Sequence, residues 1–274
     1  MSFNKWALIG SGGFIAPRHR AAIEHIGDRV ILTCDINPQS HPDFIDWGEM
    51  RRSKEWGLVT HVALCVPNDL HYSMAMEAAK EGKIVLCEKP LTVSPWTCEQ
   101  MPENVYTVLQ LRHHPEVIRL KIEGKTAKEV EMRIKVKRDA SYWHSWKGQE
   151  ARSGGILFNL GIHYFDLLIY LFGDEAGLFK IEEVHTAPRK ASGTVIIGTT
   201  RCKYTIEISD SADGQDRALT IDGKPVSLSK SDNLSFEDLH KRVYEALIFD
   251  HVGVTPKEAM KSIILVDTLK RISR

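Results

Sequence analysis

The stretch Trp6-Ala7-Leu8-Ile9-Gly10-Ser11-Gly12-Gly13-Phe14-Ile15 leads a short apolar run into a glycine-rich turn, and a helical pattern follows it. Four consecutive apolar residues are typical of a strand that is buried on both faces of a sheet. Gly10 permits a tight turn, and Gly12 lets the backbone approach a pyrophosphate because it has no Cβ. Ile15 stands where the motif G-x-G-x-x-G has its third glycine. The stretch predicts a strand, a turn and a helix whose N-terminus binds dinucleotide phosphates.

Three further apolar runs follow, at residues 30–34, 61–66 and 84–87, with helical patterns between them. Continuous apolar strands that alternate with helices indicate a parallel sheet with both faces covered, and right-handed crossovers make such a sheet doubly wound. Asp35 ends the second strand, where a carboxylate accepts hydrogen bonds from the adenosine ribose diol and repels a 2′-phosphate. This position favours NAD over NADP, the alternative being a solvated acid at a strand end.

Alternating polar and apolar residues replace this pattern after residue 115, in the runs 131–137, 204–208 and 218–221. A period of two residues predicts strands with one buried face, as in an antiparallel sheet. Asp213-Gly214 and Asp222-Gly223 are turn signals between such strands. The second part of the chain is therefore expected to hold a mostly antiparallel sheet with one open face.

Two amphipathic helices are expected to close the chain, from Phe236 to Phe249 and from Pro256 to Ile272. Thr255 precedes the second helix as its N-cap, and proline suits the first helical position. The change of pattern divides the chain into an α/β Rossmann nucleotide-binding domain at residues 1–112 and an α+β domain for substrate binding and oligomerisation at residues 113–274.

The composition is that of an ordinary globular protein, with 43% hydrophobic and 26% charged residues in a chain of 274. Lys plus Arg and Asp plus Glu number 36 each, so no global field favours nucleic acid. The first residues lack the features of a signal peptide, and no apolar stretch is expected to reach the ~18 residues of a membrane span. The 5 cysteines are scattered without a C-x-x-C pair, which predicts reduced thiols in a cytoplasmic protein, without disulfides or zinc.

Four motifs occur in order along nearly the whole chain: Gly10 to Ile15, Val66-Pro67-Asn68 with His71, Glu88-Lys89-Pro90, and Gly161-Ile162-His163-Tyr164-Phe165-Asp166. In order and spacing the sequence resembles the glucose–fructose oxidoreductase and inositol dehydrogenase (Gfo/Idh/MocA) family. The resemblance implies an NAD-dependent dehydrogenase of sugars or cyclitols. Within that family, the segments 15–19, 109–114, 145–148 and 236–240 resemble those of the UDP-N-acetylglucosaminuronate 3-dehydrogenases.

The narrower resemblance implies oxidation of the C3 hydroxyl of a UDP-linked N-acetylaminosugar uronic acid, in the biosynthesis of surface-polysaccharide sugars. It also implies a homodimer or homotetramer formed through open sheets. The partner is a small-molecule nucleotide sugar, and no nucleic acid, membrane or metal is expected. Two alternatives stay open: a dehydrogenase of another sugar or cyclitol in the same family, and a non-catalytic NAD-binding sensor that has kept the fold.

Oxidising a secondary alcohol needs a base for the hydroxyl proton and a nicotinamide that accepts hydride. Lys89 follows a parallel strand, at the sheet edge where ligands bind, and its ammonium can stabilise the developing alkoxide. His163 carries an imidazole of reference pKa ~6.5, which suits a base at neutral pH. Asn159 stands where the wider family has aspartate, and an amide cannot act as a base. One helix is expected to bring Asn159, His163 and Asp166 to neighbouring faces, with Lys89 and His163 catalytic and Asp166 positioning.

The resemblance also implies which residues contact each ligand. The cofactor-binding residues are expected to be Gly10, Gly12, Gly13, Phe14, Ile15, Asp35, Val66, Pro67, Asn68, His71, Glu88, Lys89 and Gln110. The substrate-binding residues are expected to be Arg18, His19, Lys89, Arg112, Lys147, Asn159 and His163. Arg112 and Lys147 suit the sugar carboxylate or the diphosphate. The aromatic run 142–146 suits stacking on uracil or sugar, or packing.

The chain departs from the family in size. It is compact between Asp35 and His61, and it is short between Pro90 and Gln110, which predicts a trimmed helix between Thr92 and Val105.

Overall fold

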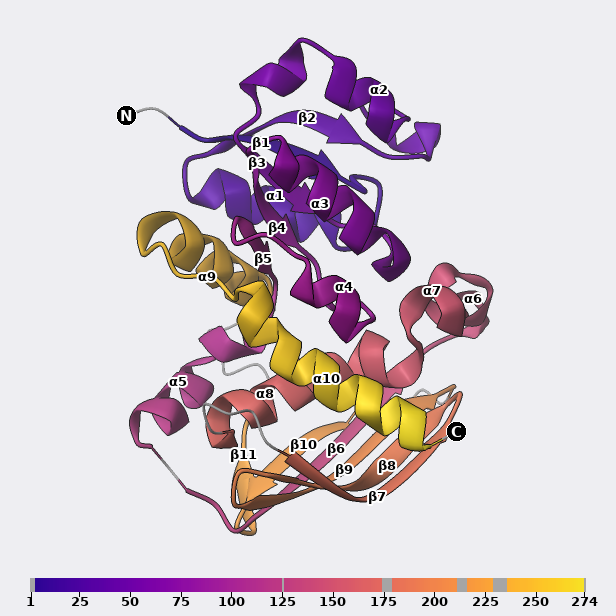
Figure 1. Ribbon diagram of the computed structural model, residues 1–274, viewed down its shortest axis with the longest axis vertical. Helices are drawn as coiled ribbons and strands as arrows, with labels where there is room; N and C mark the ends of the chain where they lie inside the picture. Colours follow the sequence, from indigo (N-terminus) through magenta and orange to yellow (C-terminus); the bar gives the residue numbers. More distant parts are fainter. Residues whose placement is uncertain (1–2, 125, 174–178, 211–215, 229–235, 274) are drawn as a thin grey trace. The chain divides into compact units, whose positions relative to one another are not determined.

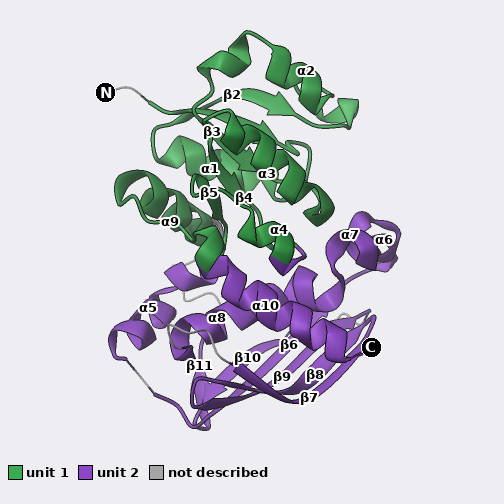
Figure 2. Cartoon of the chain, viewed as in Figure 1, with its two compact units in different colours: residues 1–92, 96–110, 235–257 green, residues 93–95, 111–234, 258–274 purple. Residues whose placement is uncertain are grey.

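A computed structural model describes residues 3–124, 126–173, 179–210, 216–228 and 236–273 of the chain. The chain forms two compact units, each drawn from separate stretches of sequence (Figure 2). Unit 1 contains residues 1–92, 96–110 and 235–257, and unit 2 contains residues 93–95, 111–234 and 258–274.

Unit 1 is built on a five-stranded parallel sheet in the order β2-β1-β3-β4-β5. Its strands are β1 (Lys5–Ile9), β2 (Arg29–Cys34), β3 (His61–Leu64), β4 (Ile84–Cys87) and β5 (Val105–Thr107). Helix α1 (Ala16–His25) connects β1 to β2, and α3 (His71–Lys80) lies between β3 and β4 (Figure 1). Because these two connections run in opposite directions along the sheet, right-handed crossovers place α1 and α3 on opposite faces. The doubly wound sheet expected from the apolar runs is confirmed.

The chain between β2 and β3 is compact. It contains the 3-10 turns η1 (Pro38–Ser40) and η2 (Glu55–Leu58) and the short helix α2 (Trp47–Arg52). Phe44 pairs with Cys34 of β2 through a single parallel bridge: its N–H donates to the Thr33 carbonyl, and its carbonyl accepts the Asp35 N–H, both at 3.1 Å. One bridging residue therefore takes the place that a further strand has in the six-stranded doubly wound order.

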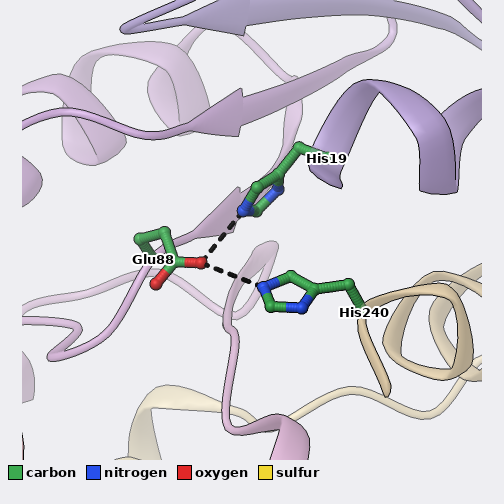
Figure 3. A group of neighbouring side chains, drawn as sticks. All are labelled: His19, Glu88 and His240. Atoms are coloured by element: carbon green, nitrogen blue, oxygen red, sulfur yellow. Dashed lines mark hydrogen bonds and ion pairs between the residues drawn. The ribbon is translucent and has the colours of Figure 1, made fainter. Parts of the chain in front are cut away.

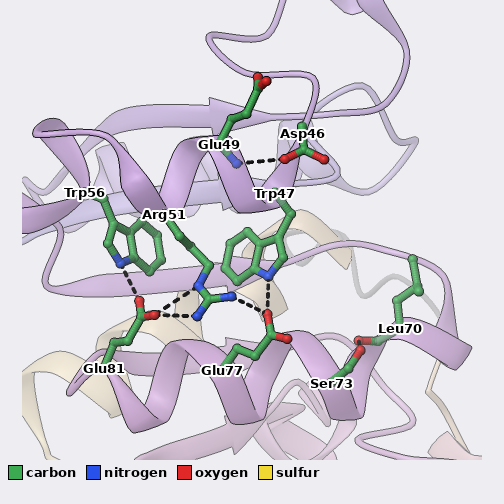
Figure 4. A network of polar contacts seen from close by, with 9 residues as sticks. All are labelled: Asp46, Trp47, Glu49, Arg51, Trp56, Leu70, Ser73, Glu77 and Glu81. Atoms are coloured by element: carbon green, nitrogen blue, oxygen red, sulfur yellow. Dashed lines mark hydrogen bonds and ion pairs between the residues drawn. The ribbon is translucent and has the colours of Figure 1, made fainter.

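A polar network holds this compact segment against α3 (Figure 4). Arg51 donates to Glu77 at 2.6 Å and forms an ion pair with Glu81, its Nε lying 3.1 Å from that carboxylate. Trp47 and Trp56 donate their indole N–H groups to Glu77 and Glu81, each at 2.6 Å. Burial would raise the pKa of Glu81, but the hydrogen bonds from Arg51 and Trp56 outweigh burial and lower that pKa. The network therefore ties α2 and η2 to α3 through charged hydrogen bonds.

Helix α9 (Phe236–Phe249) completes the core of unit 1, although it lies near the end of the chain. It packs against α1, and its Val243 and Tyr244 join a buried cluster with Trp6 and Leu8. The expected assignment of all residues 113–274 to a second domain is therefore wrong for α9, because the apolar face of this helix is buried in unit 1.

Unit 2 is built on a six-stranded sheet in the order β11-β10-β6-β9-β8-β7. Its strands are β6 (Glu129–Lys137), β7 (Phe179–Ala187), β8 (Lys190–Ile197), β9 (Thr200–Ser209), β10 (Asp216–Ile221) and β11 (Lys224–Val226). β6 and β9 pair in parallel, and the other neighbours are antiparallel. The mostly antiparallel sheet is confirmed. Asp222 and Gly223, with φ of 48° and 73°, form the predicted turn between β10 and β11, whereas Asp213-Gly214 lies outside the described residues.

The two faces of this sheet differ in burial. Along β6, Met132 and Ile134 are buried, whereas Arg133 between them is exposed. Helices α8 (Ile162–Phe172) and α10 (Pro256–Ile272) lie along the buried face, where Phe165 of α8 contacts Tyr204 of β9 with ring centroids 5.0 Å apart (Figure 1). The other face carries charged side chains, as expected of an open sheet.

Short helices and turns make up the rest of the described secondary structure. They are η3 (Asn68–Leu70), α4 (Pro95–Glu99), η4 (Gln110–His113), α5 (Pro115–Ile122), α6 (Ala140–His144), η5 (Trp146–Gly148), α7 (Glu150–Ser153) and the π-helical turn η6 (Leu157–Gly161). Helix α4 has only 5 residues, which agrees with the trimmed helix expected between Thr92 and Val105.

The helical run Glu150–Phe172 is long and apolar enough to cross a membrane, a length that no stretch was expected to reach. Of its apolar window, 67% is buried inside the protein. Gly154, with φ of +82°, ends α7 within the run, and the π-helical turn η6 interrupts it again. The run therefore has the burial of a core helix of unit 2.

We predict that Arg51→Met lowers the free energy of unfolding by about 1–2 kcal/mol, because it removes hydrogen bonds to two carboxylates but keeps an unbranched stem. Folding lowers the pKa of Glu81 from its ordinary value of 4.5. The ionised carboxylate therefore adds to the free energy of unfolding above that pH, and this stabilisation is lost as the pH falls. Denaturant titrations of wild type and variant should therefore converge at acid pH. Arg119→Met is the matched control, because among the described residues Arg119 pairs with Glu116 and Glu123, along an exposed helix surface. An equal loss in both variants would contradict a structural role for the Arg51 network.

Candidate active site

The turn after β1 has a shape that only glycine fits. Gly10 adopts φ of +76°, and a Cβ on it would lie 2.5 Å from the carbonyl oxygen of Cys65, which directly follows β3. Gly13 donates its N–H to the Gly10 carbonyl at 2.9 Å, and α1 begins at Ala16. The turn is therefore held against the end of β3, with the first N–H groups of α1 at its exit.

Asp35 lies against this turn, directly after β2. Its Oδ2 accepts the Gly12 N–H at 2.8 Å, and its Oδ1 accepts the Asn37 N–H at 2.8 Å. An ionised carboxylate offers about four lone-pair sites, so acceptor capacity remains for the hydroxyl groups of a ligand. The structure thus brings Asp35 and the glycine turn together.

His71 joins the segments that follow β3 and β4. Its Nδ1 lies 2.7 Å from the Pro90 carbonyl oxygen, and its Nε2 lies 3.0 Å from the Val66 carbonyl oxygen. Burial lowers the pKa of His71, and a neutral ring donates its single proton to one of these carbonyls. The Lys89–Pro90 peptide bond is cis. Through His71, the motif Val66-Pro67-Asn68 and the motif Glu88-Lys89-Pro90 meet at the carboxyl edge of the sheet. Doubly wound folds bind their ligands at this edge.

Two buried polar atoms near this edge have no hydrogen-bond partner within the described part of the chain. They are Ser11 Oγ in the glycine turn and Gln110 Oε1, three residues beyond β5. Buried polar groups are normally satisfied, so an unmatched atom indicates a ligand or a water molecule. Together with the cradle at Gly10, these atoms fit a bound dinucleotide.

His19 does not lie where the resemblance places it. Its side chain is fully buried within unit 1, with Nδ1 2.7 Å from the Tyr244 hydroxyl and Nε2 3.0 Å from Glu88 Oε1. Both ring nitrogens have partners, and no surface is left for a substrate. The expected substrate contact of His19 is therefore wrong. Arg18 is half-buried, and its guanidinium lies 5.6 Å from the ring centre of Phe14, which is 79% exposed.

Arg112 is engaged within unit 2. Its Nε and Nη2 donate to the two carboxylate oxygens of Asp166 at 2.8 and 2.7 Å, and its Nη1 donates to Glu258 at 3.1 Å. Burial would lower the pKa of Arg112, but Asp166 and Glu258 outweigh burial and raise it. The guanidinium therefore links α8 to α10 and is not directed at a sugar carboxylate, contrary to expectation. Asp166 pairs with Arg112, and its positioning role stays a prediction.

Unit 2 contains a cavity of about 270 Å³. Tyr142, Trp143 and Lys147 are among its lining residues, and Asn159 donates its Nδ2 hydrogen to the Tyr142 hydroxyl at 2.8 Å. Trp143 Nε1 is buried and has no hydrogen-bond partner within the described ranges. Burial lowers the pKa of Lys147. Two aromatic residues and a lysine therefore line one cavity.

His163 is the second residue of α8, and the π-helical turn η6 with Asn159 precedes it. Asn159, His163 and Asp166 lie in one helical run, as expected, but the run is π-helical at Asn159 and α-helical at His163 and Asp166. A π-helical turn is wider than an α-helical turn and is frequent at functional sites. Because of this turn, the angle around the helix axis between Asn159 and His163 differs from that in a regular α-helix.

Sequence reasoning did not assign a role to His240 or Tyr244. The structure places His240 Nε2 3.5 Å from Glu88 Oε1, and Tyr244 against His19. One signal was present in the sequence: the two polar residues stand four apart on a helix, beside the apolar Val243. Polar side chains on a buried helix face need partners, so this spacing indicated a buried network.

Two family models match the chain, and both belong to the Gfo/Idh/MocA group. The oxidoreductase family model with an NAD-binding Rossmann fold matches residues 4–107, and the model of the C-terminal alpha/beta domain matches residues 124–240. Inositol 2-dehydrogenase of Rhizobium meliloti is 30% identical over 123 residues, which are 42% of this chain and 37% of that protein. Glucose-6-phosphate 3-dehydrogenase of Bacillus subtilis is 27% identical over 188 residues, 61% of this chain and 53% of that protein. The matched part therefore spans about half or less of these relatives.

Among solved structures, the WlbA (WbpB) dehydrogenase of Thermus thermophilus in complex with NAD and UDP-GlcNAcA has a TM-score of 0.85 at 29% identity. The match covers 98% of this chain and 95% of that chain. The likeness therefore extends through both units, and the trimmed segments do not interrupt it.

We predict that Gly10→Ala weakens NAD binding at least tenfold, because a Cβ at this position collides with the Cys65 carbonyl and displaces the turn. Titration calorimetry on the purified protein measures the affinity. Gly27→Ala is the matched control: Gly27 also has a positive φ, of +83°, but nothing lies within 4 Å of its added Cβ. The control should lose about 1 kcal/mol of stability from backbone strain and keep its NAD affinity. Equal NAD affinity in the two variants would refute the assignment of the turn to the cofactor.

Proposed function

The chain belongs to the Gfo/Idh/MocA oxidoreductase family and NAD is its cofactor, and on that premise we propose that it oxidises the C3 hydroxyl of UDP-N-acetylglucosaminuronate. The likeness over 98% of the chain to a dehydrogenase solved with NAD and UDP-GlcNAcA carries this proposal. We place the reaction in the biosynthesis of surface-polysaccharide sugars in the cytoplasm. The protein would act there as a homodimer or homotetramer that uses the open face of the unit 2 sheet.

The cofactor half of the site is formed by the carboxyl edge of the unit 1 sheet. We assign the pyrophosphate to the glycine turn and the adenosine ribose to Asp35, which already bonds that turn. The remaining cofactor contacts come from the segments 66–71 and 88–89 and from Gln110. The buried Gln110 Oε1 supplies an acceptor that the described residues do not use.

The two catalytic residues, His163 and Lys89, have different roles in this proposal. NAD, when bound, supplies the acceptor for the hydride that leaves C3. His163 takes the hydroxyl proton, and the Lys89 ammonium stabilises the oxygen as negative charge develops on it. Asn159 cannot accept a proton as a base, and its amide is bonded to Tyr142, so His163 is the base in this proposal.

The cavity in unit 2 supports a nucleotide sugar as the substrate. Lys147 supplies a cation, Trp143 supplies a buried indole N–H, and the rings of Tyr142 and Trp143 offer faces for a base or sugar. Glu150 also lines the cavity, but its carboxylate forms an ion pair with Lys270 at 3.0 Å. The ion pair reduces the repulsion between Glu150 and an anionic ligand. This chemistry suits a uridine diphosphate better than an uncharged cyclitol.

The substrate is tested by incubating the protein with NAD and a panel of sugars while NADH formation is recorded. We expect turnover with UDP-N-acetylglucosaminuronate and at least a hundredfold lower kcat/KM with inositol and glucose 6-phosphate, which lack the nucleotide and its binding energy. The curated relatives that act on inositol and glucose 6-phosphate make these two the relevant competitors. Turnover confined to either competitor would overturn the proposal in favour of a different sugar or cyclitol.

The base is tested with His163→Asn. We expect kcat to fall roughly 10²–10⁴-fold while NAD affinity stays unchanged, because general base catalysis is lost and the cofactor half is intact. His185→Asn is the control, since His185 is an exposed histidine on β7 whose ion pair is with Glu183. Full activity of His163→Asn would exclude this residue as the base, and absence of any turnover in the wild type with retained NAD binding would favour the sensor.

A further inference from the structure

Buried polar side chains of unit 1 meet at Glu88, the residue that precedes Lys89, and Figure 3 shows His19 and His240 beside its carboxylate. Glu88 directly follows β4, His19 comes from α1, and His240 and Tyr244 come from α9. Glu88 Oε1 lies 3.0 Å from His19 Nε2 and 3.5 Å from His240 Nε2, and His19 Nδ1 lies 2.7 Å from the Tyr244 hydroxyl. Three segments far apart in the sequence therefore converge on one carboxylate.

The direction of each hydrogen bond follows from the protonation states. Burial lowers the pKa of His19, so its ring is neutral and carries one N–H, and burial raises the pKa of Tyr244, so its hydroxyl keeps its proton. Burial would raise the pKa of Glu88, but the contacts with His19 and His240 outweigh burial and lower it, so Glu88 is an anion. An anion only accepts. Tyr244 therefore donates to His19 Nδ1, and His19 donates its Nε2 hydrogen to Glu88.

The other carboxylate oxygen faces the next residue. Glu88 Oε2 accepts the backbone N–H of Lys89 at 3.2 Å, and the Glu88 N–H donates to the Leu64 carbonyl of β3 at 2.9 Å. The Glu88 carboxylate thus holds the backbone N–H of Lys89, just after the chain leaves the sheet at the end of β4. A buried charge is costly unless it is well hydrogen-bonded, and apolar residues of similar volume are often at least as stable.

We propose that Tyr244, His19 and His240 are positioning residues, which orient the Glu88 carboxylate so that it holds Lys89 in its catalytic place. The proposal rests on the proposed function, in which Lys89 stabilises charge on the substrate oxygen. It also gives α9 a role in the reaction, because two of the three residues stand on that helix. None of the three needs to touch substrate or cofactor.

His19, Glu88 and His240 offer ligand atoms that lie within 4.8 Å of one another, an arrangement that can also hold a metal ion. Hydrogen bonds account for the arrangement more simply. His19 Nε2 and Glu88 Oε1 stand at a normal donor–acceptor distance, and His19 Nδ1 is satisfied by Tyr244. We therefore expect the purified protein to contain no stoichiometric metal at this cluster, and elemental analysis measures this directly.

The first variant is Tyr244→Phe, which removes one hydroxyl from the chain of hydrogen bonds. We expect kcat to fall about tenfold with the KM for NAD within about threefold of wild type, because a misplaced group costs rate in the transition state without removing ground-state binding. Tyr204→Phe is the matched control, since the Tyr204 hydroxyl is buried in unit 2 and has no hydrogen-bond partner within the described part of the chain. It should leave kcat unchanged.

The second pair of variants tests the contact from α9. His240→Ala should lower kcat by roughly 10²-fold, and His240→Gln, which restores a side-chain N–H donor, should recover kcat to within about fivefold of wild type. A merely structural role would instead lower thermal stability in both variants and leave kcat of the folded protein unaltered. Unchanged kcat in folded Tyr244→Phe and His240→Ala overturns the proposal.

Amide exchange of the peptide 84–92 tests the network without a substrate. Loss of the hydrogen bond from Lys89 to Glu88 should speed exchange in this segment in Tyr244→Phe and His240→Ala, but not in Tyr204→Phe. If the wild type turns over no sugar, the proposed function fails. The exchange measurement still tests whether the network holds the backbone at Lys89, because it needs no substrate. Unaltered exchange in both network variants, or one equivalent of metal that is lost in His240→Ala, contradicts the positioning role.

Discussion

The contact between the first turn and the end of the third strand constrains the whole nucleotide half of this protein. Gly10 has a positive φ, and its α-carbon faces the Cys65 carbonyl so closely that no side chain fits between them. Because β1 lies between β2 and β3, this contact stands at the point where the strand order reverses, and ligands of doubly wound sheets bind there. Asp35, the segment after β3 and the Glu88-Lys89 pair are therefore gathered around one edge.

The second constraint is the return of the chain to unit 1 near its end. Helix α9 supplies Tyr244 and Val243 to the core that surrounds Trp6, and it supplies His240 to the carboxylate beside Lys89. The nucleotide unit therefore cannot complete its core until almost the whole chain has been made. The same helix that finishes the fold also satisfies the buried anion next to the proposed catalytic lysine, so stability and site geometry depend on a shared segment.

Hydrophobic patterns in the sequence predicted the elements whose burial is set by their own residues. The apolar runs at β1 to β4 and the alternation in β6, β9 and β10 gave both sheets, and Asp222-Gly223 gave a hairpin turn. The β7–β8 hairpin and the π-helical turn before His163 were not predicted. The placement of α9 was not predicted either, because it depends on partners distant in sequence, such as Trp6 and Leu8. His19 and Arg112 failed as substrate contacts for the same reason. The resemblance implied both contacts, and the charge of Arg112 suited an anionic ligand, but Glu88 engages His19 and Asp166 engages Arg112 within their own units.

The most direct test of the account is a crystal structure of the protein with NAD and UDP-N-acetylglucosaminuronate. We expect the pyrophosphate on the N–H groups after Gly10, the adenosine ribose on Asp35, and a His163 ring nitrogen within about 3.2 Å of the C3 hydroxyl, as a general base requires. A dinucleotide bound away from the glycine turn, or a C3 hydroxyl far from both His163 and Lys89, would contradict the account.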